Sequence, residues 1–261
     1  MRILAISSQV AYGPVGNTAA VPALQAMGHE VLGLPTIILS NHPGHGRPVA
    51  LRMPAPDLAA MLGALEHLGA LQTCGAVMTG YFAANDQIHG VARMIRRMRE
   101  ANPKLFVLVD PVIGDHDALY VPLPVAEAIR DELLPLASCA TPNRFELEWL
   151  TGWRAGSIRE AESAARQLGI AEVLATSIPA GAGKLATISV SGSTSHPCIS
   201  PLREGVPHGT GDFLAGLYLA RRMTGEASAT ALDGAMAILE NAIASSAGSA
   251  VLDVAAALHP A

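Results

Sequence analysis

Short apolar segments alternate with longer segments of helical periodicity along most of this sequence. The first apolar run, Arg2–Ser7, has the length of a β-strand. The segment Asn17–Met27 follows a helical pattern with Asn17 in the N-cap position, and His29–Pro35 is the next strand-like run. These three segments predict one βαβ unit, which is the repeating element of a mostly parallel sheet covered by helices.

The same alternation continues toward the C-terminus. Further strands are expected at Gly75–Thr79, Leu105–Val109, Ser138–Thr141, Glu172–Thr176, Lys184–Val190 and Thr194–Ile199. Further helices are expected at Asp57–Leu68, Asn85–Glu100, Val125–Leu133, Arg144–Leu150, Ser157–Leu168, Gly211–Met223 and Ala229–Ser246. Gly- and Ser-rich turns connect the last three strands, which predicts antiparallel strands at one edge of the sheet. We therefore expect an α/β protein whose residues 1–261 form a single domain.

Composition and charge limit the classes of protein to which this chain can belong. It has 261 residues, of which 50% are hydrophobic, so it can bury one large core. Its formal net charge is −5 and no run of Lys and Arg exceeds a pair, which argues against a nucleic-acid partner. No unbroken apolar stretch reaches about 18 residues, which argues against a membrane span. The three cysteines form no CxxC pair, so we expect a reducing, cytoplasmic location.

Polar side chains stand where several of the predicted strands end. Ser8, Tyr81, Asp110, Asn143 and Thr176 each come just past the C-terminal end of an expected strand. Open α/β sheets bind their ligands along that edge, outside the carboxyl ends of the strands. The sequence therefore predicts a ligand site there.

The segment Gly209-Thr210-Gly211-Asp212 opens one of the last predicted helices. The unpaired N–H groups at a helix start attract anions, and glycines let a phosphate approach the backbone. Asp212 in the first turn could accept a proton from a hydroxyl group that attacks phosphorus. The alternative is an ordinary loop followed by an acidic residue that favours the helix N-terminus.

Two further loops accompany this segment, and together the three resemble known motifs. Gly209–Asp212 resembles the GTGD motif of the ribokinase superfamily, and Asp110–Asp115 (DPVIGD) resembles its DPV(M/I)GD loop. The segment Thr141–Glu146 resembles the TPNxxE segment of the same superfamily. The resemblance implies a ribokinase-like three-layer α/β/α fold and transfer of a phosphoryl group from ATP. It also implies that Asp212 is the catalytic base and that the Gly209, Thr210 and Gly211 amides stabilise the transferred group.

The resemblance further implies where ATP and Mg²⁺ bind. The ATP site would comprise Asp115, Thr141, Asn143, Glu146, Thr176, Ser177, Gly209 and Gly211, and the metal site would comprise Asp110, Asp115 and Glu146. Carboxylate oxygens suit Mg²⁺, which offsets the negative charge of the triphosphate. A requirement for a monovalent cation is left open. The alternative for these loops is turn chemistry, with Glu146 as a helix first-turn acid.

The N-terminal half resembles the pyridoxal kinase family. Ser8–Asn17 resembles the SHVxxGxVGN segment of that family, Ser40–Gly46 its SNHTGYG loop and Thr79–Tyr81 its TGY motif. The implied vitamer-binding residues are Ser8 at the polar edge of a pyridine ring, Tyr81 over its face, His42 and Asp212. Two positions depart from the family pattern: Gln9 replaces His, and Pro43 replaces a Thr and offers neither a hydroxyl nor an N–H group.

The expected function is phosphorylation of the 5′-hydroxymethyl group of pyridoxal, and of pyridoxine or pyridoxamine, by a homodimeric kinase. A hydroxymethylpyrimidine kinase is the nearest alternative, because it shares the GTGD and DPV loops. A vitamer-binding protein without turnover is another, motivated by Gln9 and Pro43. A dinucleotide-binding oxidoreductase fits less well, since no GxGxxG follows the first strand. For the HxxH pair His42 and His45, zinc binding is the alternative to loop packing or substrate contact.

Overall fold

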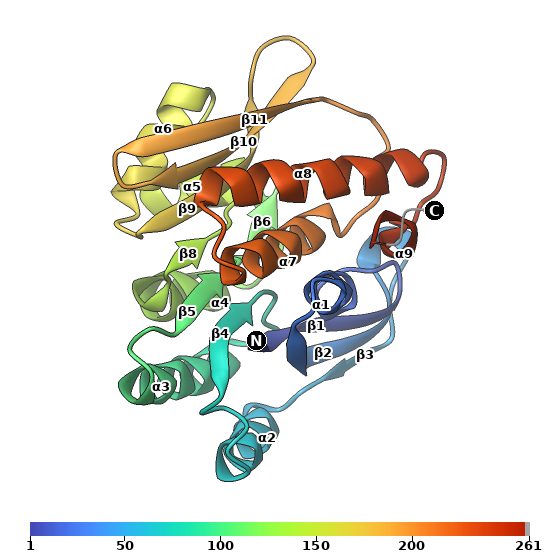
Figure 1. Ribbon diagram of the computed structural model, residues 1–261. Coiled ribbons are helices and arrows are strands. Elements are labelled where there is room, and N and C mark those ends of the chain that lie inside the picture. The colour runs from blue at the N-terminus through green and yellow to red at the C-terminus, as the bar shows by residue number, and fades with distance from the viewer. Residues whose placement is uncertain (259–261) are drawn as a thin grey trace.

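A nine-stranded sheet runs through the centre of the computed structural model, which describes residues 1–258 (Figure 1). The strand order is β11-β10-β9-β8-β5-β4-β1-β2-β3. The strands are β1 Arg2–Tyr12, β2 Glu30–Asn41, β3 Ala50–Arg52, β4 Cys74–Thr79, β5 Phe106–Val109, β8 Cys139–Ala140, β9 Glu172–Pro179, β10 Lys184–Ser191 and β11 Thr194–Pro201. All pairings from β9 to β2 are parallel. The pairings of β10 with β9 and β11 are antiparallel, as the turn-rich C-terminal strands predicted, and the unpredicted strand β3 pairs antiparallel with β2.

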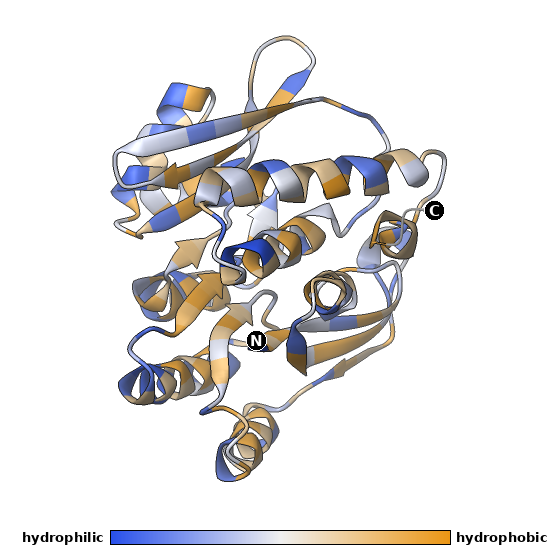
Figure 2. Cartoon of the chain, in the orientation of Figure 1, coloured by the Kyte–Doolittle hydropathy of each residue, from blue (hydrophilic) through white to orange (hydrophobic). Residues whose placement is uncertain are grey.

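Helices cover both faces of the sheet, so the predicted three-layer architecture is confirmed (Figure 1). One face carries α1 Asn17–Ala26, α7 Thr210–Met223, α8 Ser228–Ser245 and α9 Val254–Leu258. The other carries α2 Ala55–His67, α3 Asn85–Ala101, α4 Leu123–Ala128, α5 Arg144–Thr151 and α6 Ile158–Gln167. The hydropathy colours show apolar strands between helices whose polar sides face outward (Figure 2). Burial of these apolar faces is the main force that holds the three layers together.

The first two strands differ most from their predicted lengths. Pairing of β1 with β4 ends at Ile6 and Thr79, but pairing of β1 with β2 continues to Tyr12 and Asn41. The two strands therefore project beyond the rest of the sheet, and β3 pairs with this projecting part of β2. Buried and exposed residues alternate along the projecting part of β1, with Ser8 and Val10 buried and Gln9 and Ala11 exposed, and the mixture of polar and apolar residues there hid the strand from the apolar pattern.

The structure corrects three predicted positions: those of Ser8, of Thr176 and of the N-cap of α1. Ser8 lies inside β1 and Thr176 inside β9, rather than past the ends of these strands. The N-cap of α1 is Gly16, not Asn17, whose side chain instead donates a hydrogen bond to the Leu34 carbonyl oxygen at 3.2 Å. Burial of the Asn17 amide against β2 thus outweighs its preference for the cap position.

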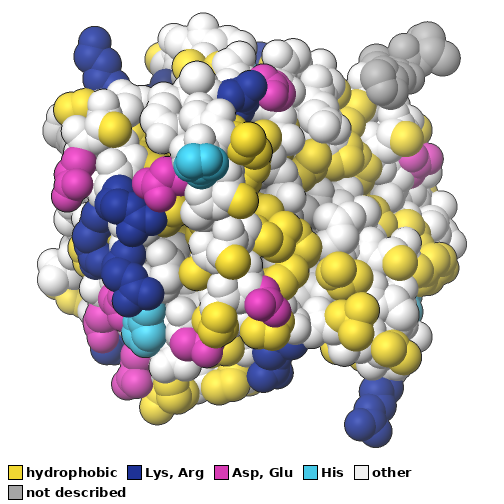
Figure 3. All heavy atoms as spheres, turned by 90° about the horizontal axis from the view of Figure 1, so that it is seen from below, with side chains coloured by type: hydrophobic (Ala, Val, Ile, Leu, Met, Phe, Trp, Pro, Cys, Tyr) yellow, Lys and Arg dark blue, Asp and Glu magenta, His cyan; other side chains and the backbone are white. Residues whose placement is uncertain are grey.

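Basic side chains gather along one side of the face seen in Figure 3, with acidic side chains next to them. Seen from below, basic and acidic side chains lie among apolar ones (Figure 3). On α3, Arg97 forms an ion pair with Glu66 of α2 at 3.2 Å. None of the helices within residues 1–258 has both the length and the hydropathy needed to cross a membrane.

Candidate active site

The N-terminus of α7 lies against the loop that follows β1. Gly209 is the N-cap residue and has a φ of 96°, in the left-handed region that favours glycine. A Cβ atom at Gly209 would lie 1.9 Å from the Pro14 carbonyl oxygen, so a side chain has no room there. Asp212 lies in the first turn of the helix, where its carboxylate accepts a hydrogen bond from the Gly16 N–H group. The helix start thus places one carboxylate beside backbone amides that can bind an anion.

Asp110 is the second carboxylate at this site, and it follows β5 directly. Its side chain is buried and accepts a hydrogen bond from the Thr141 hydroxyl at 2.8 Å. Burial, together with the charge of Asp212, raises the pKa of Asp110. Burial also raises the pKa of Asp212, although hydrogen bonds from backbone N–H groups oppose this. The two carboxylates therefore lie in a poorly solvated region where a cation would be stabilising.

Glu146 connects the Asp110–Asp115 loop to the start of α5 through hydrogen bonds. It forms a capping box with Asn143 at the start of α5, in which each side chain accepts a hydrogen bond from the other residue's N–H at 2.9 Å. The Glu146 carboxylate also accepts a hydrogen bond from the Ile113 N–H at 3.0 Å, and the Asn143 amide donates one to the Gly114 carbonyl oxygen at 2.8 Å. Burial and the charge of Asp110 raise the pKa of Glu146. Asn143 and Glu146 therefore do cap the start of α5, as the alternative to a ligand role proposed.

Asp115 and Tyr120 lie on a hairpin between these loops. Its strands are β6 Gly114–Asp115 and β7 Ala118–Leu119, and both turn residues have positive φ values. The Asp115 side chain is more than half exposed and accepts a hydrogen bond from the His116 N–H at 2.8 Å. Desolvation raises the pKa of Tyr120, as do the charges of four carboxylates: Glu146, Asp110, Asp212 and Asp115. Tyr120 is 55% exposed overall, and the charges of these four carboxylates place its hydroxyl group near the acidic cluster. No feature of the sequence pattern pointed to it.

Thr176 and Ser177 approach the same region from β9. Thr176 lies beside Asn143 in a parallel bridge, and its N–H donates to the Pro142 carbonyl oxygen at 2.9 Å. Ser177 has a φ of 60°, which is uncommon for a residue other than glycine. A strained serine beside a predicted nucleotide loop suits a functional position better than simple strand-end polarity.

The predicted vitamer residues Ser8 and Tyr81 come from adjacent strands. Ser8 is buried, and a Cβ atom at Gly16 would lie 2.3 Å from its hydroxyl oxygen. Tyr81, two residues after β4, is held through both of its backbone polar groups: its N–H donates to the Ser7 hydroxyl at 3.1 Å, and its carbonyl accepts from the Thr36 hydroxyl at 2.7 Å. Ser7 and Thr36 are thus supporting residues that the motifs did not reveal.

The third predicted vitamer residue, His42, belongs to a group of histidines. His42 precedes the short helix η1 Pro43–His45, and the His42 and His208 ring centroids are 4.1 Å apart. His45 lies edge-on to His42 at 6.2 Å and to Tyr12 at 5.1 Å. Within residues 1–258 no set of three or more His, Cys, Asp or Glu side chains is grouped as metal ligands. Zinc binding by the HxxH pair therefore finds no support.

Mg²⁺ makes different demands on the acidic residues. It usually keeps several waters and takes only one or two protein carboxylates together with phosphate oxygens, so it needs no ready-made cage. Burial, and then the charge of a neighbouring carboxylate, raises the pKa of Asp110 and of Glu146, so a bound cation would stabilise the ionised form of these groups. Asp110 and Asp115 fit as ligands or as partners of metal-bound water. Glu146 fits only as an outer partner, because both of its oxygens already accept backbone hydrogen bonds.

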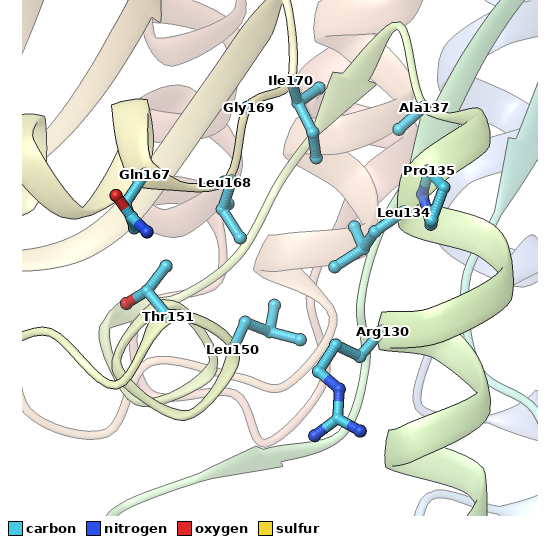
Figure 4. A pocket seen from close by; sticks show the side chains of 10 residues that line it. All are labelled: Arg130, Leu134, Pro135, Ala137, Leu150, Thr151, Gln167, Leu168, Gly169 and Ile170. Carbon is cyan, nitrogen blue, oxygen red and sulfur yellow. The ribbon is translucent and has the colours of Figure 1, made fainter.

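A surface pocket of about 380 Å³ lies far from this chemistry. It is lined by residues that precede β8 and β9 and by the C-terminal end of α5, at the opposite edge of the sheet (Figure 4). Its basic residue, Arg130, already forms an ion pair with Asp131 at 2.7 Å. The other lining residues are Leu134, Pro135, Ala137, Leu150, Thr151, Gln167, Leu168, Gly169 and Ile170. No acid, base or nucleophile gathers in it, so we place the active site at the carboxyl edge.

This fold, with a carboxylate and free amides at the start of α7, defines a kinase of the ribokinase-like class. A family model described as phosphomethylpyrimidine kinase matches residues 58–254, which is most of the chain. The match includes the loops that carry Asp110, Glu146 and Asp212.

Comparisons over nearly the whole chain are more specific. It is 36% identical over 249 residues to a pyridoxine/pyridoxal/pyridoxamine kinase from Bordetella avium, covering 93% of this chain and 84% of that protein. It is 34% identical over 251 residues to a pyridoxal kinase from Corynebacterium diphtheriae, covering 92% and 89%. The structure of a Leishmania donovani pyridoxal kinase with ADP and pyridoxine matches with a TM-score of 0.92 and 30% identity, covering 100% of this chain and 96% of that one. The chain therefore belongs to the pyridoxal kinase family, as the sequence predicted.

Proposed function

We propose that this enzyme transfers the γ-phosphoryl group of ATP to the 5′-hydroxymethyl oxygen of a B6 vitamer, with pyridoxal as the first candidate. The observation that carries the proposal is the position of Asp212 beside the free amides of α7 and across from Asp110. Relatives that are named for pyridoxal, pyridoxine and pyridoxamine support the vitamer assignment. We propose a single catalytic domain, because the loops with Asp110 and Glu146 and the helix α7 all belong to the one layered unit built on the nine-stranded sheet.

Asp212 would act as the general base. Its raised pKa brings the carboxylate closer to the basicity needed to accept a hydroxyl proton, and the Gly16 N–H group keeps it oriented. Once the hydroxymethyl group has given up its proton, its oxygen attacks the γ-phosphorus, and ADP leaves from the opposite side. The amides of Gly209, Thr210 and Gly211 would stabilise the charge on the phosphoryl group during transfer.

The nucleotide would lie along the carboxyl edge between the Asp110–Asp115 loop and Thr176. Mg²⁺, when bound with ATP, would neutralise charge on the phosphate oxygens. Asp110 and Asp115 would hold it there, with Glu146 fixing the loop between them. Asn143, Thr141, Thr176 and Ser177 would position the triphosphate.

The vitamer would lie between β1 and the residues after β4. Ser8 would form a hydrogen bond with the polar edge of the ring, and Tyr81 would cover its face. His42 would close the site from the loop after β2.

The proposal also includes the oligomeric state and the cellular location of the enzyme. The projecting part of β1 and β2, together with β3 and the residue before it, exposes the side chains of Tyr12, Ile38, Val49 and Leu51. This exposed edge supports a homodimer, which sedimentation equilibrium would test. The three free cysteines support a cytoplasmic enzyme.

The decisive experiment is ADP release from Mg·ATP with pyridoxal, pyridoxine, pyridoxamine and hydroxymethylpyrimidine offered separately. We expect turnover with at least one B6 vitamer at a higher kcat/KM than with the pyrimidine. The pyrimidine arm is needed because the matching family model is named for a phosphomethylpyrimidine kinase. A preference for the pyrimidine would overturn the vitamer assignment, and vitamer binding without ADP release would indicate a carrier.

A further inference from the structure

His208 is a residue that none of the recognised motifs uses, although it precedes the GTGD segment directly. Its ring lies over the ring of His42 with a centroid separation of 4.1 Å and an interplanar angle of 33°. A Cβ atom at Gly44 would lie 2.5 Å from His208 Nε2, so the glycine lets the ring approach the loop backbone closely. The chain segment before α7 therefore contacts the loop after β2 through His208.

His42 in turn determines the shape of that loop. Its Nδ1 atom accepts a hydrogen bond from the Gly44 N–H group at 3.1 Å and so caps the short helix η1. His45, the last residue of η1, packs edge-on against His42, and a Cβ atom at Gly13 would lie 2.8 Å from its Nε2 atom. The loop is thus held from the β1 side by His45 and from the α7 side by His208.

We propose that His208 is a positioning residue: by stacking on His42 it holds the loop His42–Gly46 at the N-terminus of α7, where the vitamer must meet Asp212. The inference rests on the proposed function, because it gives the loop a role in vitamer binding. It assigns to His208 no contact with the reacting atoms. Its effect is therefore expected in the affinity for the vitamer rather than in the chemical step.

The state of His42 supports this arrangement. Burial, and then the charges of His208 and His45, lower the pKa of His42 to about 4. These two histidines are the titratable groups that face His42, one from the segment before α7 and one from η1. A neutral ring is what the cap requires, since Nδ1 can accept the Gly44 N–H only when it carries no proton. The stack and the cap therefore favour the same protonation state.

Replacing His208 by Ala and by Phe tests the proposal. His208→Ala should raise KM for pyridoxal about two- to tenfold, the range of an aromatic pair, and leave kcat and KM for ATP unchanged. His208→Phe keeps an aromatic ring and should restore the wild-type KM. His196→Ala is the matched control, because His196 lies on β11 and pairs with Asp233 of α8. A purely structural role would change all of the kinetic constants together, and an unchanged vitamer KM in His208→Ala would overturn the proposal.

Gly44→Ala tests the contact from its other side. The φ of Gly44 is not in the left-handed region, so Ala fits the backbone, but its Cβ would lie 2.5 Å from His208 Nε2 and 3.0 Å from His42 Nδ1, with the closer clash on the His208 ring. We expect Gly44→Ala to raise the vitamer KM, and to do so much less in a His208→Ala background. Independent effects in the double variant would contradict the proposal.

A readout that needs no turnover separates this proposal from the proposed function. NMR titration of the ring protons should give a higher His42 pKa in His208→Ala than in His208→Phe, because the phenyl ring keeps His42 covered and the methyl group does not. Equal His42 pKa values in the two variants would overturn the stacking role even if the enzyme were active. Absence of vitamer-dependent ADP release from the wild-type enzyme would instead overturn the proposed function.

Discussion

The two sides of the proposed site differ in how their side chains are held. On the phosphoryl-transfer side, Asp110 and Glu146 are buried, and each accepts hydrogen bonds from neighbouring loops. On the vitamer side, the loop around Pro43 lies on a projecting ribbon, and Gln9 is exposed. Asp110 and Glu146 are thus fixed by burial and by hydrogen bonds from other loops, whereas Gln9 and Pro43 on the vitamer side are exposed.

This difference matches the distribution of family motifs. The GTGD, DPVIGD and TPNxxE segments follow the superfamily pattern, while both departures, Gln9 and Pro43, fall on the vitamer side. A change within the buried network leaves donors or acceptors without partners, which is costly. A change on the exposed ribbon costs little stability and can alter which ring is bound. We infer that the reaction type is more constrained than the choice of vitamer.

The largest effect should come from Asp212→Asn. Asn is nearly isosteric and can still accept the Gly16 N–H, but it cannot take a proton from the attacking hydroxyl. We expect kcat to fall by roughly 10²–10⁴-fold with little change in ATP affinity. Steady-state kinetics and nucleotide titration measure the two quantities, with Asp233→Asn on α8 as the control. Near-normal turnover would remove Asp212 from the role of base.

Glu146→Ala should have the next largest effect. It removes the acceptor shared by the N–H groups of Ile113 and Asn143 and half of the α5 capping box. We expect a loss of about 2–3 kcal/mol in the free energy of unfolding and a fall in kcat/KM for ATP. Urea unfolding measures the first, and Glu100→Ala, an exposed glutamate near the end of α3, is the control. Equal stability of the two variants would contradict the role of Glu146 in joining the loops.

A smaller, pH-dependent effect is expected for Asp110→Asn in the absence of metal. Because its pKa is raised, folded Asp110 keeps its proton at pH values where the unfolded chain has lost it. The unfolded state then binds fewer protons, so this group lowers the free energy of unfolding as the pH rises above about 4. Asn removes this penalty and can still accept the Thr141 hydroxyl. The stability of the variant relative to wild type should therefore increase from about pH 5 to about pH 8.

Thermal unfolding in EDTA over this range would measure the effect. Addition of Mg·ATP should reduce the advantage of the variant, because the cation would stabilise the wild-type carboxylate. A Tm difference that stays constant or shrinks with rising pH would show that Asp110 is ionised at its ordinary pKa.

The smallest effects should come from restoring the family residues on the exposed side. Pro43→Thr and Gln9→His should each change KM for a vitamer by less than about tenfold and leave kcat for pyridoxal nearly unchanged. Comparison of kcat/KM across the four acceptor substrates measures the change in preference. A large fall in kcat from either substitution would mean that the two sides of the site are not separable.

Much of the fold could be predicted because local patterns and tertiary packing agree over most of the chain. The predicted start of α7 differs from the observed one by a single residue, and Asp110 follows its strand as expected. The missed strands β3, β6 and β7 and the missed helix α9 span only two to five residues, which is too short for a periodic pattern to be distinct. Tyr120, Ser7 and Thr36 were missed because each acts through neighbours that are distant in sequence.

The sequence by itself determined the layered architecture, the family and the order of the acidic loops, because hydrophobic periodicity and short motifs are local properties of the chain. The tertiary structure decided which of those residues share an environment. It placed Asp110 beside Asp212 and raised the pKa of both by burial, and it engaged Glu146 with backbone amides. It also brought His208 onto His42 across a long separation in sequence. Solvation and contact between distant segments depend on the packed sheet and helices, so no local pattern could contain them.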